Sequence, residues 1–322
     1  MININEKLIG VKTVAITGHI RPDGDCVGST LGFYNYIKDN FPEISADVYL
    51  EKPGHEFAYL RYFEQIQTKI REKSKRYDLL FVFDCGDEGR FEPFVELISM
   101  ADRVICIDHH MSNSGFADEN YVIPDISATC ELLYECLTDS MISKETAECL
   151  YTGIICDTGI FRYPAVTSRT MQIAGNLMNK GINHNKIIDD AFFTKTYRQN
   201  QLMGRALLES ELILDGKCIY SAVSKETMDF YGLFPKEMGG VIDQLRNTEG
   251  VEVAIFLYEL HEGEYKASIR SREYIDVSRL CQKFGGGGHV RASGCTIKGE
   301  VADIIKRISE ELIIQFREHG VN

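Results

Sequence analysis

The chain has 322 residues, of which 44% are hydrophobic, so it is long enough for one large domain or two ordinary domains with cores of their own. Its 48 acidic residues outnumber 35 basic residues and give a net charge of -13, which disfavours a long nucleic acid as a stably bound partner. The N-terminus lacks the pattern of a signal peptide, and no apolar run is long enough for a membrane span. We therefore expect a cytoplasmic protein that does not bind membranes.

The first half of the chain alternates short apolar runs with amphipathic segments. Strands are predicted at residues 12–17, 46–50, 77–84 and 102–108, and the amphipathic segments between them include residues 29–40 and 63–74. Helical patterns follow at residues 128–137, 144–156 and 168–181. Strands that alternate with helices in this way indicate an α/β domain with a parallel sheet and crossover helices.

The pattern changes between about residues 186 and 203, where the sequence becomes polar and interrupted. Beyond it we expect strands at residues 217–224, 251–260 and 264–271, and a final helix at residues 301–320. The predicted organisation is an N-terminal parallel-sheet domain, a linker and a smaller α/β domain with a mixed sheet. Their predicted bounds are residues 1–188, 189–203 and 204–322.

Acidic residues and histidines gather where three of the predicted strands end. His19, Asp23 and Asp25 follow the first strand, Asp84 ends the strand at residues 77–84, and Asp108, His109 and His110 end the strand at residues 102–108. A further acid, Asp157, ends the helical pattern at residues 144–156. In open parallel sheets the ligand site lies beyond the carboxyl ends of the strands, so these side chains are expected at one edge.

Carboxylates and imidazoles without an obvious set of thiolates suit Mn²⁺ or Mg²⁺, and the histidines favour Mn²⁺. Four or more carboxylates in one crevice repel one another unless cations are present, and about six ligands are too many for one small ion. Two ions are therefore expected. Such ions, about 3.5 to 4 Å apart, can share a carboxylate and a hydroxide and can activate that hydroxide for in-line attack on phosphorus.

Each cluster alone has a simpler explanation. The DHH tripeptide at residues 108–110 could be a polar strand end, the PDGD segment at residues 22–25 has the composition of a turn, and Asp157 could be an ordinary helix-end residue. The site prediction depends on all of the clusters occurring together in a chain that has α/β patterns throughout.

The motifs HIRPDGDCVGS, FDCGDEGR, DHH and CDTGIFRY, in this order, resemble the four motifs of the DHH phosphoesterase superfamily. The segment SIRSREYIDVSRLCQKFGGGGHVRASG resembles the glycine-rich DHH-associated C-terminal domain. The resemblance covers essentially the whole chain. Within the superfamily the chain is similar to the stand-alone bacterial oligoribonucleotidases (nanoRNases) that are also 3'-phosphoadenosine-5'-phosphate (pAp) phosphatases.

The resemblance implies a set of metal ligands and catalytic residues. His19 and Asp23 would hold one Mn²⁺, Asp25, His109 and Asp157 the other, and Asp84 would bridge the two. A bridging carboxylate is best supplied by a central strand, and residues 77–84 form the most continuously apolar one. Asp108 would orient the neighbouring histidines, and His110 would contact the scissile phosphate or assist the leaving group.

In the second domain, the resemblance implies that a glycine run contacts the substrate. Consecutive backbone N–H groups of glycines can approach an anion without obstruction, although GGGG also occurs in flexible linkers and at helix ends. The flanking arginines suit bidentate contacts with phosphate and favour substrate binding. The predicted substrate-binding residues are Arg270, Ser271, Gly286, Gly287, Gly288, His289 and Arg291.

The expected activity is hydrolysis of a short oligoribonucleotide, a linear dinucleotide or pAp by attack of a metal-bridging hydroxide. Cyclic di-AMP hydrolysis is the alternative within the same chemistry. A nucleotide sensor without turnover is the alternative from another class, although all six predicted ligands are present and a sensor would have little reason to hold two metals. The partner is expected to be a short nucleotide, and the resemblance raises the possibility of a homodimer.

Four cysteines lie close in sequence to the predicted ligands, namely Cys26, Cys85, Cys106 and Cys156. They could bind metal or control it by oxidation, or they could be small buried thiols that fill space. Because neighbours in a strand point to opposite faces, Cys85 is expected to face away from a metal that Asp84 faces.

Overall fold

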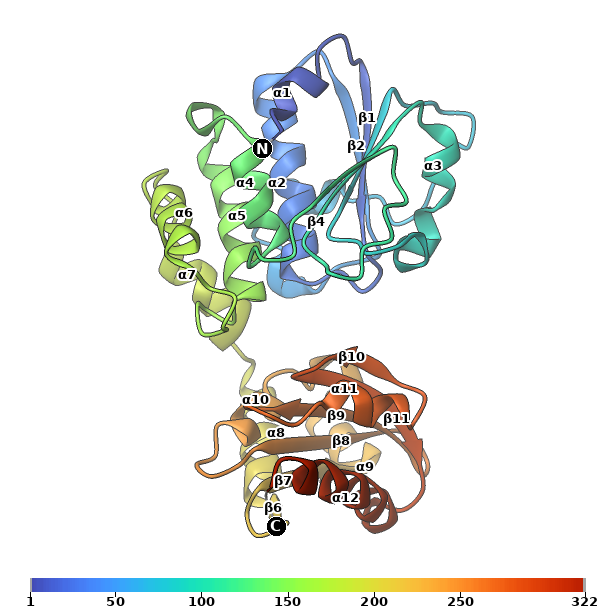
Figure 1. Cartoon of the computed structure of the whole chain (residues 1–322), viewed down its shortest axis with the longest axis vertical. Coiled ribbons are helices and arrows are strands. Elements are labelled where there is room, and N and C mark those ends of the chain that lie inside the picture. Colours follow the sequence, from blue (N-terminus) through green and yellow to red (C-terminus); the bar gives the residue numbers. More distant parts are fainter. Residues whose placement is uncertain (1, 321–322) are drawn as a thin grey trace. The chain divides into compact units, whose positions relative to one another are not determined.

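The computed structural model describes residues 2–320, apart from the side chain of His289. The chain divides into two compact units, Met1–Thr194 and Lys195–Asn322 (Figure 1). The division lies within the predicted linker at residues 189–203, but most of that segment is helical. It contains the π-helix Asp189–Phe193 and the first residues of helix α8 (Tyr197–Leu208).

Unit 1 contains a five-stranded sheet in which every neighbouring pair of strands is parallel. The strands in sheet order are β2 (Ser45–Tyr49), β1 (Thr13–Gly18), β3 (Leu79–Phe83), β4 (Val104–Asp108) and β5 (Glu119–Val122). The parallel sheet confirms the fold class predicted for this half. Because β1, β3 and β4 are adjacent, the segments that follow them meet at one edge.

The central strand β3 is buried along its whole length, because helices cover both faces of the sheet. Phe81 and Phe83 pack into the core that contains α2 (Gly24–Asn40), whereas Leu80 and Val82 pack into a second core with α3 (Glu96–Met100). Figure 1 shows α3 on the opposite side of the sheet from α2.

The remaining helical segments of unit 1 complete these two layers. They are α1 (Ile4–Lys7), α4 (Thr129–Cys136), α5 (Lys144–Asp157), α6 (Ser168–Met178), α7 (His184–Ile188) and the 3₁₀ segments His55–Phe57, Phe63–Gln65, Glu88–Phe94 and Asp139–Met141. Two of these helices begin at side-chain caps. The Ser143 side chain accepts a hydrogen bond from the Thr146 N–H at the start of α5. Thr167 and Thr170 form a capping box at the start of α6.

Helices α2 and α5 approach closely through glycines. A Cβ atom on Gly28 would lie 2.5 Å from the Cys149 carbonyl oxygen, and one on Gly153 would lie 2.7 Å from Asp25 Oδ1. Neither position has room for a side chain. The close packing brings Asp25 on α2 next to the end of α5, where Asp157 lies.

The amphipathic segment at residues 63–74 does not form a helix, apart from the short 3₁₀ turn Phe63–Gln65. Gln67 instead extends the edge of the sheet, where its N–H donates to the Val48 carbonyl and its own carbonyl accepts from the Leu50 N–H. Pairing with an exposed sheet edge satisfies these backbone groups.

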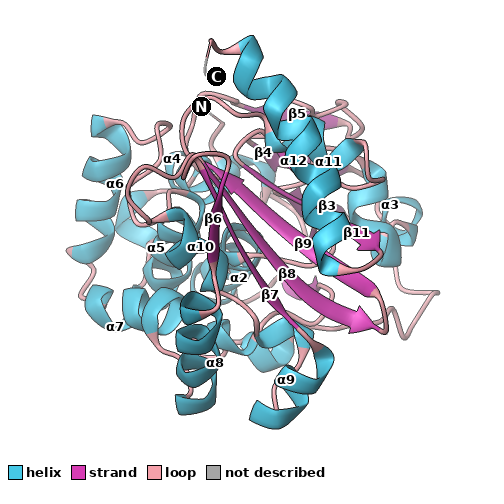
Figure 2. Ribbon diagram, turned by 90° about the horizontal axis from the view of Figure 1, so that it is seen from below, coloured by secondary structure: helices cyan, strands magenta, loops and turns pink. Residues whose placement is uncertain are grey.

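Unit 2 contains a six-stranded mixed sheet, as predicted, in which only β7 and β8 are parallel. In sheet order the strands are β10 (Gly287–His289), β11 (Ala292–Lys298), β9 (Glu264–Ser271), β8 (Val253–His261), β7 (Cys218–Val223) and β6 (Glu211–Ile213). Figure 2 shows β7, β8 and β9 side by side.

Helices cover both faces of this sheet. One core contains α11 (Val277–Gln282) and α12 (Val301–Glu318), and the other contains α8, α9 (Lys225–Tyr231) and α10 (Val241–Arg246). The 3₁₀ turn Pro235–Glu237 lies between α9 and α10 in the chain and has no buried residue. Within residues 2–320, no helix has both the length and the apolar character needed to cross a membrane.

Candidate metal centre and substrate-binding loop

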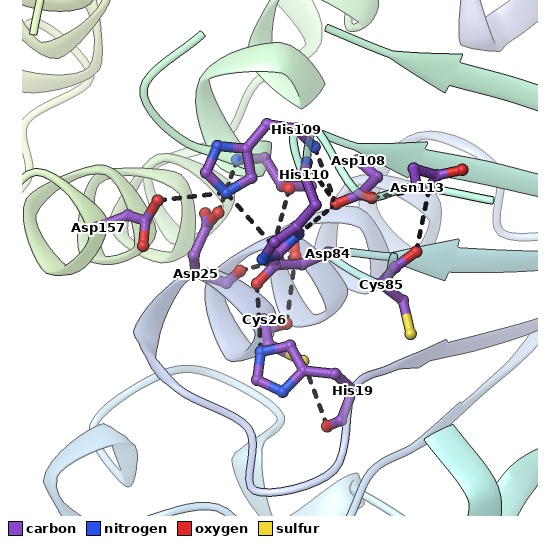
Figure 3. Close-up of polar contacts among 12 residues, drawn as sticks. His19, Asp25, Cys26, Asp84, Cys85, Asp108, His109, His110, Asn113 and Asp157 are labelled. Carbon is purple, nitrogen blue, oxygen red and sulfur yellow. Dashed lines mark hydrogen bonds and ion pairs between the residues drawn. The ribbon is translucent and has the colours of Figure 1, made fainter. Parts of the chain in front are cut away.

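The predicted metal ligands lie together at the carboxyl edge of the parallel sheet (Figure 3). His19 follows β1 directly, Asp84 follows β3 and His109 follows β4. Asp84 has a φ of 55°, so the chain turns into the left-handed region at the end of β3. Backbone strain of this kind is frequent where a functional side chain must be placed.

His19 faces two carboxylates. Its Nε2 lies 3.3 Å from Asp84 Oδ2 and 3.6 Å from Asp23 Oδ1. Its Nδ1 lies 2.8 Å from the Ile20 carbonyl oxygen and donates to it, which leaves the lone pair of Nε2 for a ligand. Asp23 also caps α2, where its Oδ1 accepts from the Asp25 N–H.

His109 is arranged in the same way on the other side of Asp84. Its Nε2 lies 3.3 Å from Asp157 Oδ2 and 3.7 Å from Asp84 Oδ1. Its Nδ1 lies 3.2 Å from the Ile126 carbonyl oxygen, a bond that again directs Nε2 toward the acids. The ligand atoms of Asp25, His109 and Asp157 lie within 4.8 Å of one another.

Asp84 lies between the two histidines. Its ligand atom groups with those of His19 and Asp23, and its Oδ1 lies 3.7 Å from Nε2 of His109 in the other group. Its side chain is buried, with Oδ2 toward His19 and Oδ1 toward His109. Each of its oxygens therefore faces a different imidazole, as a bridging carboxylate must. A third group of ligand atoms joins Asp84 and His109 to His110, which the sequence placed at the substrate and not among the ligands.

Asp25 is buried and held by backbone donors from the first turn of α4. Its Oδ2 accepts from the Thr129 N–H at 2.6 Å, and its Oδ1 accepts from the Cys130 N–H at 2.9 Å. The Thr129 hydroxyl donates to Asp84 Oδ1 at 3.1 Å. Negative charge is favourable at a helix N-terminus, so these contacts help to position Asp25.

Asp108 lies behind the ligands and organises the DHH segment. Its Oδ1 accepts from the backbone N–H of His109 and from Nδ1 of His110, at 2.9 and 2.7 Å. Its Oδ2 accepts from Asn113 Nδ2 at 2.7 Å. The Asp108 side chain is fully buried, and these bonds fix both the turn after β4 and the His110 ring.

Without a bound cation, protons neutralise part of the negative charge of the cluster, because several pKa values are raised. Burial and the charge of Asp84 raise the pKa of Asp25 to about 7. Burial alone would lower the pKa of both histidines, but hydrogen bonds to Asp23 and Asp84 raise that of His19 to about 10. The charges of Asp25, Asp157 and Asp84 likewise raise the pKa of His109 to about 9.

These residues fit divalent cations. The carboxylates are crowded, and each of the two ligand histidines has one ring nitrogen tied to a carbonyl and the other directed at the acids. Oxygen and imidazole donors are the ligands expected for Mn²⁺, with Mg²⁺ as the harder alternative. One group of ligand atoms contains His19, Asp23 and Asp84, another contains Asp25, His109 and Asp157, and a third joins Asp84 to His109 and His110. The number of ions stays a prediction.

Three of the four cysteines near the predicted ligands are buried, and Cys156 is half-buried. Cys26 and Cys85 are buried, and burial raises the pKa of each thiol above its ordinary value. The sulfur of Cys85 points away from the acids in Figure 3, into the core that contains α3. Among the described residues, no cysteine joins a group of ligand atoms that could hold a metal.

In unit 2 the glycine run connects α11 to β10. Gly285 has a φ of 71°, and a Cβ atom on Gly286 would lie 2.3 Å from the Gly294 carbonyl oxygen. The N–H groups of these two glycines donate to the Gln282 and Cys281 carbonyls at the end of α11. The prediction of free N–H groups is therefore wrong for Gly285 and Gly286, whose N–H groups bond the last turn of α11 instead.

Gly287 and Gly288 lie in β10 and pair with β11, opposite Gly294 and Ser293. Gly288 has a φ of 143°, and a Cβ atom there would lie 2.6 Å from the Ala292 carbonyl oxygen. The backbone of His289 also lies in β10, but the prediction for its side chain lies outside the described residues.

The other predicted contacts of unit 2 surround the loop after β9. Ser271 is buried, and its hydroxyl donates to the Ile275 carbonyl at 2.6 Å. Arg291 Nη1 donates to the same carbonyl at 2.7 Å. Arg270 is half-buried, and its Nη1 donates to the Ile269 carbonyl at 3.1 Å. Ser271 therefore shapes the loop, whereas the two arginines keep further N–H groups for an anion.

Sequence reasoning missed two side chains that bond predicted site residues, namely Thr129, which bonds Asp84, and Asn113, which bonds Asp108. The pattern at residues 128–137 predicts only a helix, although a threonine at a helix start, such as Thr129, commonly uses its hydroxyl for a polar contact. Asn113 lies five residues after Asp108 in a turn-like segment, and no spacing rule links the two.

Comparisons with known proteins agree with this geometry. A family model described as "DHH family, N-terminal domain" matches residues 13–154, and one described as "DHHA1 domain" matches residues 215–313. The chain belongs to the DHH family. It is a phosphoesterase of this family, with a DHH domain followed by a DHHA1 domain.

Two curated relatives span nearly the same length as this DHH-family chain. The protein named "Bifunctional oligoribonuclease and PAP phosphatase NrnA" of Thermus thermophilus is 29% identical over 314 residues, which cover 93% of this chain and 90% of the relative. The protein of the same name from Bacillus subtilis is 24% identical over 312 residues, with 95% and 96% covered. A solved structure of an exopolyphosphatase-related protein from Bacteroides fragilis matches with a TM-score of 0.90 and 25% identity, covering 98% of this chain and 95% of that one.

Proposed function

We propose that this DHH-family phosphoesterase uses two Mn²⁺ ions to hydrolyse short oligoribonucleotides to mononucleotides and pAp to AMP and phosphate. One observation carries the proposal, namely that the two oxygens of Asp84 face His19 and His109, which belong to two separate groups of ligand atoms. The substrate class is supported by the names of the Thermus and Bacillus relatives, which span nine-tenths or more of both chains.

The residues have distinct roles in this proposal. His19 and Asp23 would hold one ion, Asp25, His109 and Asp157 the other, and Asp84 both. Bound ions would supply Lewis acidity and an activated water for attack on phosphorus. The rigid turn after β4 and the tied Nδ1 atoms of the histidines preorganise the ligands, so that little reorganisation is needed during the reaction.

His110 is the proposed residue for proton transfer to the leaving oxygen. Its Nδ1 bonds Asp108 and lies 3.5 Å from Asp84 Oδ1, so the ring stands at the border of the cluster. The Asp108 hydrogen bond raises the pKa of His110, which favours the protonated form that a general acid needs.

The second unit would bind the rest of the nucleotide. Arg270 and Arg291 are the proposed phosphate contacts, because a guanidinium can donate two parallel hydrogen bonds to a phosphate. A small number of arginines suffices for one or two nucleotides, which agrees with the net charge of -13. The cytoplasmic location, the absence of long nucleic acid and the homodimer stay predictions.

The test is product analysis with purified protein and Mn²⁺. The substrates are pAp, linear di-adenylate, cyclic di-AMP, a long single strand and inorganic polyphosphate, with Asp84→Ala as the blank. The proposal predicts turnover of pAp and the short linear substrate only. Fastest turnover of cyclic di-AMP would move the role to second-messenger breakdown, and no turnover of any substrate would favour a nucleotide sensor.

A further inference from the structure

A turn between β5 and α4 contacts two of the predicted metal ligands through different atoms. We define it as the 126–130 turn. The carbonyl oxygen of Ile126 accepts from His109 Nδ1 at 3.2 Å, and the hydroxyl of Thr129 donates to Asp84 Oδ1 at 3.1 Å. The first contact sets the direction of the His109 ring, and the second fixes one oxygen of the central carboxylate.

The same turn holds a third predicted ligand. The backbone N–H groups of Thr129 and Cys130 donate to the two carboxylate oxygens of Asp25, at 2.6 and 2.9 Å. Asp25 is 1% exposed, so these bonds are shielded from water. A displacement of the 126–130 turn would therefore move ligand atoms of both predicted ions together.

The conformation of the turn depends on one buried acid, Glu131. Its side chain is 2% exposed, and its Oε2 accepts from the Ser127 N–H at 3.3 Å and from the Ser127 hydroxyl. Thr170 on α6 donates from Oγ1, which lies 3.0 Å from the same oxygen and 3.2 Å from Oε1. Glu131 thus joins the turn to a neighbouring helix.

This contact differs from an ordinary helix cap. Glu131 is the third residue of α4, and in a capping box a glutamate there bonds the N-cap residue's own N–H. Here it reaches Ser127, one residue further back, while the N-cap Ala128 has no side-chain hydrogen bond. The bond consequently fixes the chain before the helix, where the metal-facing turn lies.

We infer that Glu131 is a positioning residue of the metal centre. It holds Ser127, Ser127 fixes the 126–130 turn, and the turn fixes the ligand atoms of His109, Asp84 and Asp25. This inference rests on the proposed function, because it takes these three residues as metal ligands. Residues that orient metal ligands commonly change metal affinity or activity by about 10- to 100-fold when they are replaced.

The experiment measures Mn²⁺ affinity directly, without substrate, from the electron paramagnetic resonance signal of free Mn²⁺ during titration of the metal-free protein. Glu131→Ala is expected to weaken binding by about 10- to 100-fold. Glu131→Gln is expected to stay within a few-fold of wild type, because its amide oxygen still accepts from Ser127 and its amide N–H can donate to Thr170.

Two further variants separate positioning from general stability. Leu177→Ala removes a buried side chain from α6 without touching the turn, so it should lower the unfolding temperature and leave Mn²⁺ affinity unchanged. Ser127→Ala removes the hydroxyl that Glu131 binds and should weaken Mn²⁺ binding several-fold, even where Glu131→Ala proves too unstable to purify.

Equal Mn²⁺ affinity of Ser127→Ala and wild type would overturn the inference, as would a folded Glu131→Ala variant that binds as tightly as Leu177→Ala. If the wild-type protein binds Mn²⁺ tightly and these variants do too, only the role of Glu131 fails. If wild-type protein binds no divalent ion, the proposed metal centre fails, and the role of Glu131 fails with it.

Discussion

The imidazole of His110 is held by the carboxylate of Asp108, whose Oδ1 lies 2.7 Å from His110 Nδ1. The same oxygen accepts from the backbone N–H of His110 at 3.2 Å, so one buried atom fixes both the ring and its peptide. The His110 ring is thereby oriented at the border of the acid cluster.

Replacement of Asp108 by Asn should lower kcat by about 10- to 100-fold, with a smaller change in KM. The reason is that a neutral amide cannot stabilise a protonated His110 as the carboxylate does. Steady-state kinetics on pAp at saturating Mn²⁺ measure the effect. The matched control is Asp102→Asn, an exposed acid just before β4 at the other end of the strand, and an unaltered kcat in Asp108→Asn would contradict this role.

Gly153→Ala should damage both packing and metal binding. Its Cβ atom would lie 2.2 Å from Cys130 Sγ and 2.7 Å from Asp25 Oδ1, so helix α5 or Asp25 must move. Overpacking of this kind costs about 1–3 kcal/mol of the free energy of unfolding. Denaturant unfolding and Mn²⁺ titration measure the two effects.

Gly175→Ala on α6 is the control for that substitution. Beyond the neighbouring residues and the backbone of α6 itself, no atom lies within 4 Å of a Cβ there, and alanine is favoured over glycine within a helix by about 0.5–1 kcal/mol. This variant should therefore be as stable as wild type or slightly more stable, with normal Mn²⁺ affinity. Equal behaviour of the two variants would show that the α2–α5 contact does not control the position of Asp25.

Metal-free protein should lose stability as the pH rises from about 5 to 9. The raised pKa of Asp25, about 7, means that the folded state keeps a proton that the unfolded chain has released, so stability falls as pH rises from about 4 through about 7. For His19 and His109, with pKa values raised to about 10 and about 9, the contribution is complete below about 6.5 and is lost as pH rises through those values.

Thermal unfolding in the presence of a chelator, repeated at several pH values, checks this expectation. Bound Mn²⁺ should raise the unfolding temperature and weaken the dependence on pH, because cations replace the protons. The Asp25→Asn variant should lose the part of the dependence that lies below about pH 7. A metal-free protein whose unfolding temperature rises steadily from pH 5 to 9 would contradict the electrostatics described for the cluster.

The sequence predicted the site better than it predicted the loops around it. Residues at strand ends, such as Asp84 and His109, could be placed because parallel strands deliver their carboxyl ends to one edge. Thr129 could not, because its contact with Asp84 depends on where α4 begins relative to the end of β3. The prediction of a helix at residues 63–74 was wrong for a related reason. An amphipathic pattern does not reveal that a neighbouring sheet edge offers hydrogen-bond partners to the backbone.

The glycine run illustrates the same limit. Its composition suggested a row of anion-binding N–H groups, but two of the glycines are needed where α11 ends and where β11 passes closely, as Gly285 and Gly286 show. Glycine permits many conformations, and the tertiary contacts decide which one is used.

Arg291→Ala should raise KM for pAp about tenfold or more, with a smaller effect on kcat, because the residue lies in unit 2, which is proposed to bind the nucleotide, and not among the predicted metal ligands. A hydrogen bond to a charged group contributes about 1.5–3 kcal/mol, which sets this magnitude. Arg317→Ala on the exposed side of α12 is the control. Unchanged KM values on every nucleotide substrate would remove Arg291 from the site.

The most direct test of the two-metal centre is the number of Mn²⁺ ions bound per chain, measured by equilibrium dialysis and elemental analysis for wild type and Asp84→Asn. Because the two oxygens of Asp84 face histidines of two separate groups of ligand atoms, wild-type protein should bind two ions, and the variant should bind fewer than two with weaker affinity and no measurable hydrolysis. One ion or none in the wild type, or two tightly bound ions in Asp84→Asn, would contradict the account.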